Sequence, residues 1–112
     1  MTFPVTEQHF TTESQAYEEI AKMGWHASAR DVVVSTDTDL HVHEFNTVAF
    51  IVSGSNRIGF ADGSEQRCGA GCRVQAAAGT VHRELAGSNY RVIFGFDRDP
   101  TQFTQPINKP VA

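Results

Sequence analysis

The sequence predicts an all-β fold, a sandwich or barrel, with one short N-terminal helix. After Gly24, short β-like segments follow one another at close spacing and are separated by glycine-containing turns, which is typical of both architectures. Only one segment, about residues 12–23, carries its apolar residues at helical spacing. The 112 residues are enough for one hydrophobic core, so we expect residues 1–112 to form a single domain.

The composition narrows the class of protein. Hydrophobic residues make up 40% of the chain and charged residues 20%, as in globular proteins rather than disordered ones. The nine Lys and Arg residues are scattered and the net charge is -4, so we expect no nucleic-acid partner. No apolar run is long enough to cross a membrane. The first twenty residues contain glutamates and no Lys or Arg, unlike a signal peptide, and we therefore expect a cytoplasmic protein.

The N-terminal part is expected to consist of an arm and the helix. Residues 1–11 show no clear period and look like an arm. The helix at about 12–23 begins with a capping box formed by Thr12 and Gln15, and Gly24 is suited to its left-handed C-cap. Its apolar face consists of Ala16, Tyr17, Ile20 and Ala21. Such a helix would cover a sheet face or an open barrel edge.

The barrel is expected to span about residues 25–98. β-Branched and aromatic residues indicate strands within 25–35, 41–54, 57–60, 72–75, 80–85 and 90–96. Turns are predicted at 36–39, 54–56, 62–63 and 68–71, and Asp62-Gly63 is a strong hairpin signal. In the last strand, one face is formed by Tyr90, Val92, Phe94 and Phe96. Pro100, Pro106 and Pro110 prevent regular structure, so we expect the tail 99–112 to be irregular and partly mobile.

Two histidines begin the predicted strand 41–54. His41 and His43 point to the same side of an extended chain, roughly 6.6 Å apart along the backbone. Two imidazoles at this spacing can share one metal ion, although a His-x-His pair also occurs by chance. The same face continues through Phe45, Thr47, Ala49 and Ile51, and the opposite face through Val48 and Phe50.

A third histidine lies on another predicted strand. His82 follows the turn at Gly79, 39 residues after His43, and shares its face with Thr80 and Glu84. A His-x-His near the start of one strand and a single His near the start of another can bring three ligands together inside a small barrel. At this point the chain resembles the cupin superfamily.

The first cupin motif is Gly, five residues, His-x-His, three or four residues, Glu, six residues, Gly. His41, His43 and Gly54 match it. Thr47 occupies the position of the glutamate, and Ser35 stands where the opening glycine is expected.

The second motif is Gly, five residues, Pro-x-Gly, two residues, His, three residues, Asn. Gly71, Gly79 and His82 match it, whereas Ala77 replaces the proline and Ala86 the asparagine. The resemblance covers about residues 30–98, and every spacing within the two motifs is kept. It implies a cupin double-stranded β-helix, that is, a jelly-roll barrel, and a homodimer that packs sheet edges or exchanges terminal arms.

The resemblance further implies one divalent transition metal ion held by His41, His43 and His82. Imidazole ligands do not distinguish zinc, iron, nickel, copper and manganese on their own. The missing glutamate matters, because three neutral imidazoles leave the charge of the ion uncompensated and such a site favours an anionic ligand. Thr47 could bond a metal-bound water or be a small inward-facing residue.

Two further residues could take part in chemistry. Glu84 could complete the coordination or act as a base, or it could reach the rim and pair with an arginine. Tyr90 is the other candidate base. The resemblance implies a dioxygenase, isomerase, cyclase or lyase type of reaction on a small anionic or oxygen-chelating substrate. The alternative is a non-catalytic cupin that binds a small acid or sugar.

The remaining candidates are expected to be bystanders. Cys68 and Cys72 flank a turn and would stay thiols in a reducing compartment. A Cys-x-x-x-Cys pair could hold zinc or act as a redox switch, but no second pair completes a zinc cage. His9 and His26 lie outside both motifs and are expected at the surface.

Overall fold

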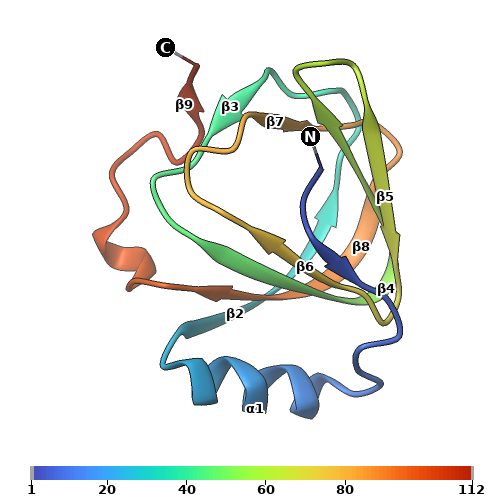
Figure 1. The fold of residues 1–112 in the computed structure, drawn as a ribbon, viewed down its shortest axis with the longest axis vertical. Coiled ribbons are helices and arrows are strands. Elements are labelled where there is room, and N and C mark those ends of the chain that lie inside the picture. Colours follow the sequence, from blue (N-terminus) through green and yellow to red (C-terminus); the bar gives the residue numbers. More distant parts are fainter. Residues whose placement is uncertain (1, 112) are drawn as a thin grey trace.

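The computed structural model describes residues 2–111 as a curved β-sheet closed into a barrel, with one helix packed outside it (Figure 1). The predicted all-β fold with one short helix is confirmed. The elements are β1 (Val5–Thr6), α1 (Glu13–Met23), β2 (His26–Val33), β3 (His41–Val42), β4 (Thr47–Phe60), β5 (Glu65–Gly69), β6 (Arg73–Ala76), β7 (His82–Glu84), β8 (Asn89–Phe96), the 3-10 turn η1 (Pro100–Gln102) and β9 (Lys109–Pro110). No helix among these residues is long and apolar enough to span a membrane.

Strand β4 organises the sheet. Its first part, from Thr47 to Ile51, lies between β8 and β6, and β8 in turn pairs with β2. Its second part pairs with β5 on one side, and its end pairs with β7. Strand β7 continues to β3 and β9, so the sheet order carries the chain from the N-terminal strand β1 round to the C-terminal strand β9. All of these pairings are antiparallel.

The prediction of one strand over 41–54, followed by a turn at 54–56, is wrong. The chain leaves β3 after Val42, and β4 begins at Thr47 and runs without a break to Phe60. The bend that the glycine signals is absorbed within β4, where the register against β8 shifts between Ile51 and Ser53. Gly54 has a φ of 73°, and a Cβ atom there would lie 2.0 Å from the backbone oxygen of Asn89. Glycine thus permits a bulged strand here rather than a reversal.

Helix α1 covers the outside of the barrel below β2 and β8, as Figure 1 shows. Both predicted ends are confirmed: the Thr12 and Gln15 side chains form the capping box, and Gly24 adopts the left-handed conformation with a φ of 73°. Ala16 and Ile20 are buried against the sheet, whereas Tyr17 is 41% exposed. At the contact, Gly95 of β8 lies so close to Ile20 that a Cβ atom would come within 2.9 Å of it.

The alternation along the strands divides the core in two, as predicted. Ala49, Ile51, Tyr90 and Val92 belong to a cluster inside the barrel, and Val48, Phe50 and Ile93 belong to a cluster under the helix. A third cluster, formed by Phe45, Phe96 and Phe103, joins the tail to the barrel. The inside face of β4 and β8 therefore lines the interior in which the histidines lie.

Both terminal segments are more ordered than the sequence suggested. Val5 and Thr6 of the expected arm form β1, which pairs with β6, and the neighbouring Phe3 is buried in the interior cluster. The tail was predicted to be irregular, but residues 109–110 form β9 and pair with β3. Figure 1 shows this last segment rising beside the barrel to reach β3.

Candidate functional site

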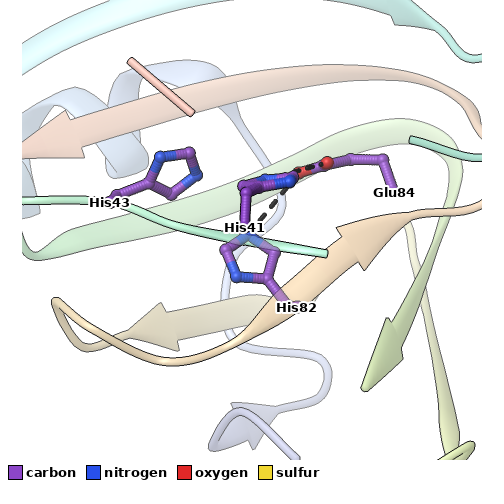
Figure 2. A group of neighbouring side chains, drawn as sticks. All are labelled: His41, His43, His82 and Glu84. Carbon is purple, nitrogen blue, oxygen red and sulfur yellow. Dashed lines mark ion pairs between the residues drawn. The ribbon is translucent and has the colours of Figure 1, made fainter. Parts of the chain in front are cut away.

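Three histidines meet at one end of the barrel interior. His41 lies in β3, His43 just after it, and His82 in β7, and the register pairs His41 directly with His82. The ring centroids are 4.6 Å apart for His41 and His82, 5.1 Å for His41 and His43, and 5.0 Å for His43 and His82. His41 and His82 are only 3% and 5% exposed. The structure thus brings together the three predicted histidines (Figure 2).

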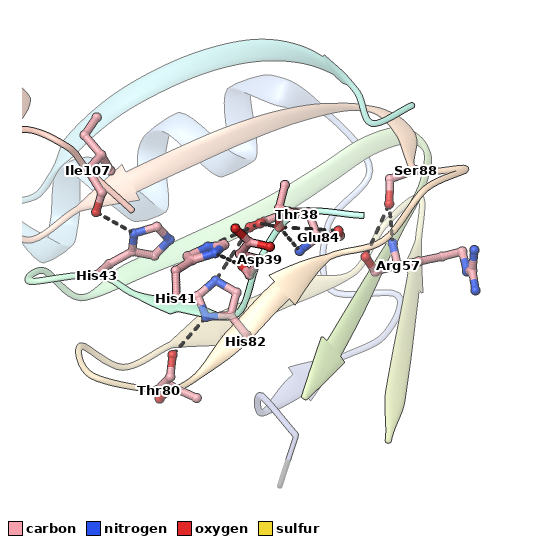
Figure 3. A network of polar contacts seen from close by, with 10 residues as sticks. All are labelled: Thr38, Asp39, His41, His43, Arg57, Thr80, His82, Glu84, Ser88 and Ile107. Atoms are coloured by element: carbon pink, nitrogen blue, oxygen red, sulfur yellow. Dashed lines mark hydrogen bonds and ion pairs between the residues drawn. The ribbon is translucent and has the colours of Figure 1, made fainter. Parts of the chain in front are cut away.

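Each of the three rings is held by a backbone carbonyl. The Nδ1 atom of His41 lies 2.7 Å from the carbonyl oxygen of Asp39, that of His82 lies 2.9 Å from Thr80, and that of His43 lies 3.2 Å from Ile107 (Figure 3). A carbonyl oxygen can only accept, so each Nδ1 carries a proton and donates it. In the neutral ring the lone pair is then on Nε2. This is how protein structures orient imidazoles that bind a metal through Nε2.

Glu84 completes the group from the strand that carries His82. Its carboxylate oxygens lie 3.2 Å from Nε2 of His41 and 3.6 Å from Nε2 of His82. The hydroxyl of Thr38 donates to the same carboxylate at 3.0 Å. One donor atom from each of the three histidines and Glu84 lies within 4.8 Å of the others. Glu84 thus points inward to the histidines, and among residues 2–111 no arginine pairs with it.

The electrostatics of the group favour a positive charge between the donors. The Nε2 atom of His41 is buried and faces a Glu84 carboxylate oxygen at 3.2 Å, so in a ring that carries its proton on Nδ1 two lone pairs would oppose each other. Burial lowers the pKa of His41, but the hydrogen bond and negative charge of Glu84 outweigh it and raise the pKa. Burial also lowers the pKa of His43, which favours its neutral form. Burial raises the pKa of Glu84, but hydrogen bonds to His41 and His82 reverse this and hold the pKa well below its usual range.

These residues therefore fit a divalent metal ion. Three Nε2 donors and one carboxylate form the kind of mixed nitrogen and oxygen set that zinc, iron and related ions accept. The single carboxylate would offset part of the ionic charge. A proton on His41 could also satisfy the contact with Glu84. It would not explain why the rings of His43 and His82 are oriented in the same way by carbonyl groups.

A cavity of about 350 Å³ opens from this group into the barrel. Its wall is mostly aliphatic and aromatic, and it includes Phe45, Ala49, Ile58, Val74, Phe94 and Phe96. His43, His82 and Glu84 lie at its polar end. A pocket with an apolar wall and a few converging polar groups is typical of a small-molecule site.

Tyr90 and Thr47 both line the cavity, and the surroundings of each hydroxyl restrict its chemistry. Burial raises the pKa of Tyr90 to about 12, with the negative charge of Glu84 as a smaller cause, so this phenol stays protonated near neutral pH. The hydroxyl of Thr47 donates to the carbonyl of Gly95 at 2.8 Å, which occupies its only proton and leaves its oxygen able to accept.

Several residues of the site were not identified from the sequence. Thr38 lies in a predicted turn, and both its hydroxyl and its backbone nitrogen contact Glu84. Asn56 faces the cavity from the middle of β4, where a turn was expected. Ile107 acts through its carbonyl, and no side-chain pattern in a sequence reports a carbonyl position. Glu84, by contrast, could be identified from the sequence, because it lies two residues after His82 and therefore on the same face of the strand.

The other candidate residues lie elsewhere. Cys68 and Cys72 are free, buried thiols outside the histidine group, and burial raises the pKa of Cys68 to about 11. His9 contacts Glu19 on the outside of the barrel at 2.6 Å, and His26 is exposed at the start of β2.

Comparisons with known proteins support the fold. No family model and no curated protein matches the sequence. Among solved structures, a DUF861 family protein from Thermotoga maritima aligns with a TM-score of 0.55 at 15% identity, over 82% of this chain and 96% of that one. A cupin-2 domain protein from Shewanella frigidimarina aligns with a TM-score of 0.52 at 19% identity, over 65% and 71%. The EutQ protein of Clostridium difficile aligns with a TM-score of 0.50 at 10% identity, over 86% and 94%.

These identities are low, so the likeness concerns the backbone and not a shared activity. It agrees with the motif spacings, with the closed antiparallel barrel and with the position of the histidines at one end of its interior. The chain has the fold of a small, single-barrel cupin.

Proposed function

We propose that this protein is a metal-dependent small cupin that holds one divalent transition metal ion through His41, His43, His82 and Glu84. The observation that carries the proposal is the orientation of the three rings, each fixed by an Nδ1 hydrogen bond to a carbonyl so that Nε2 is free to bind. Glu84 supplies the carboxylate that Thr47 cannot supply at the position usual for cupins. The ion is zinc, iron, nickel, copper or manganese, because imidazole and carboxylate suit all of them.

We further propose that the cavity binds a small substrate with an anionic or chelating oxygen, and that the protein is an enzyme of the dioxygenase, isomerase, cyclase or lyase type. When bound, the ion would supply Lewis-acid chemistry, or oxygen chemistry in the case of iron. The apolar wall excludes water from the substrate. Tyr90 stays protonated and can donate a hydrogen bond to an oxygen anion, while Glu84 is ionised and can only accept hydrogen bonds.

A second candidate function is a non-catalytic protein that binds a small acid or sugar at the same site. One observation favours it: both carboxylate oxygens of Glu84 already face histidines, and Tyr90 is a poor base. Turnover of a bound ligand by the metal-loaded protein would decide for the enzyme. In either case we propose a cytoplasmic homodimer.

The metal site can be tested by elemental analysis of protein purified without a histidine tag. We expect about one equivalent of a transition metal per chain, and we expect His82→Ala to remove it, because three protein ligands hold an ion far less firmly than four. His26→Ala is the matched control, since His26 is exposed and belongs neither to the histidine group nor to the cavity wall. Full metal content in a folded His82→Ala protein would contradict the proposal.

A further inference from the structure

Arg30, an exposed residue of β2, lines the same cavity as the Glu84 carboxylate. On β2 it shares its face with Val32, and Val34 follows with the same alternation; all three line the cavity. Among the residues of 2–111 that line it, Arg30 is the only Lys or Arg and Glu84 the only acid. The cavity thus has one permanent positive charge and one permanent negative charge, each from a different strand.

The guanidinium of Arg30 has no carboxylate partner among the described residues. Its Nε donates to the hydroxyl of Ser28 at 3.3 Å, and no acidic oxygen of this part of the chain lies within 4.0 Å of it. Arg57, Arg73, Arg91 and Arg98, in contrast, each contact a carboxylate. An arginine that keeps its donors free beside a pocket is suited to a planar anion.

A row of aromatic rings connects Arg30 with the histidines. The Arg30 guanidinium carbon lies 6.0 Å from the ring centroid of Phe96, Phe96 lies 5.3 Å from Phe45, and Phe45 stacks on His43 at 5.0 Å. The rings of His43 and Phe45 are nearly parallel, with an angle of 17° between them. A flat, apolar ligand body can lie along this wall, with one end at the histidines and the other at Arg30.

We infer that the ligand of this cavity is a carboxylic acid with an aromatic or other apolar body, and that Arg30 binds its carboxylate while its other end offers oxygen to the metal. This inference rests on the proposed function. The cavity volume of about 350 Å³ has room for a body of one ring with a short side chain. Because the metal end already contains Glu84, the free positive charge of Arg30 is what selects an acid over its neutral analogue.

The test uses zinc-loaded protein and hydroxamates as metal-binding probes, with binding measured by isothermal titration calorimetry. One probe is benzohydroxamate. The others carry a carboxylate at the para position, joined directly or through one or two CH₂ groups, and each has a matched carboxamide of the same size. The variants are Arg30→Gln and Arg30→Lys. Arg67→Gln is the control, since Arg67 is also exposed, likewise donates to a serine hydroxyl and does not line the cavity.

For at least one of the three linker lengths, we expect wild type and Arg67→Gln to bind the carboxylate probe about tenfold more tightly than its carboxamide. This is the preference expected of one charge-assisted pair at a partly exposed site. Arg30→Gln should bind both equally, and Arg30→Lys should keep part of the preference. Benzohydroxamate itself should bind all variants alike.

The outcomes separate the two proposals. Metal-dependent binding of benzohydroxamate with the same carboxylate preference in wild type and Arg30→Gln, or with no preference at any length, would overturn the role of Arg30 and leave the metal site intact. A protein that takes up no zinc, or that binds no hydroxamate when loaded, would overturn the proposed function and this inference with it.

Discussion

The histidine group depends on three carbonyl oxygens as much as on the histidines themselves. Those of Asp39 and Thr80 lie two residues before His41 and His82, so the local chain direction at the start of β3 and β7 brings them into place. The third belongs to Ile107, 64 residues after His43. Partners of this kind fix the tautomer and the ring plane, and they strengthen a metal site without touching the metal.

Glu84 is the residue whose replacement separates a four-ligand group from a three-histidine one. In Glu84→Gln the side chain keeps its size and can still accept from Thr38, but it loses the charge that opposes the ion. We expect the affinity for zinc to fall at least tenfold, which corresponds to about 1.4 kcal/mol or more. Competition with a chromogenic chelator measures this affinity.

Glu18→Gln is the control for that change, because Glu18 is exposed on the helix and its substitution removes the same unit of charge. Equal zinc affinity in the two variants would show that Glu84 is not a ligand. The contacts of His41 and Glu84 would then be those of an ordinary ion pair.

Among the secondary-structure elements, the C-terminal segment is the one that closes the site. Phe103 stacks on Phe45 with a centroid distance of 4.1 Å, and the Glu44 carboxylate accepts from the backbone nitrogen of Thr104 at 2.7 Å. Lys109 donates to the carbonyls of Thr104 and Pro106, which holds the segment in a compact loop before β9. These contacts place the Ile107 carbonyl next to His43.

Deletion of residues 100–112 should therefore weaken the metal site while the barrel persists. The deletion removes the carbonyl that orients His43 and the ring that stacks on Phe45. Loss of such an orienting partner typically costs 10- to 100-fold in metal affinity, and we expect about that loss, measured by the same chelator competition.

Deletion of residues 111–112 alone is the matched control, because it leaves Ile107 and β9 in place. Unchanged metal affinity after the longer deletion would show that His43 does not need the tail. A loss of cooperative unfolding would show instead that the tail is part of the core.

The bend of strand β4 predicts that replacing Gly54 costs more stability than replacing Gly24. Gly24 and Gly54 share a φ of 73°, but a Cβ atom at Gly24 meets no atom within 4 Å, whereas one at Gly54 would meet the backbone of Asn89. Gly24→Ala should cost about 1 to 2 kcal/mol of unfolding free energy through backbone strain alone. Gly54→Ala should cost about 1 to 3 kcal/mol more, since the sheet must move to admit the methyl group. Urea unfolding measures both, and equal costs would contradict the close approach of β4 and β8.

For the molecule as a whole, strand β2 presents a long sheet edge. Among residues 2–111 it pairs with β8 alone over its eight residues, and its Val33 is 73% exposed. An unpaired edge strand is prone to pair with another chain. This edge therefore supports the proposed homodimer, in which β2 of one protomer would lie beside β2 of its partner.

Val33→Lys places a charge on that edge without touching the cavity. We expect light scattering after size exclusion to show a dimer for the wild type and at least a tenfold increase in the dimer dissociation constant for the variant, with unchanged metal content. Ser35→Lys, just beyond the end of β2, is the control. A monomeric wild type would contradict the dimer, and an unaffected dimer would place its interface elsewhere.

Much of this architecture could be predicted from local patterns. The capping box and Gly24 bound the helix, Asp62-Gly63 makes the hairpin between β4 and β5, and alternation separates the residues inside the barrel from those under the helix. The path of β4 could not be predicted, because a glycine with positive φ serves equally in a turn and in a bulge. What decides between them at Gly54 is the neighbouring strand β8.

The sequence by itself determined that three histidines at cupin spacing and Glu84 share faces of two strands, because side-chain direction along a strand follows from the backbone alone. Only the tertiary structure decided that Glu84 faces His41 and His82, that the tail holds His43, and that Arg30 lines the same cavity without a carboxylate partner among residues 2–111. These are contacts between segments far apart in the chain, and they form only when the sheet closes into a barrel. No pattern within one segment can carry that information.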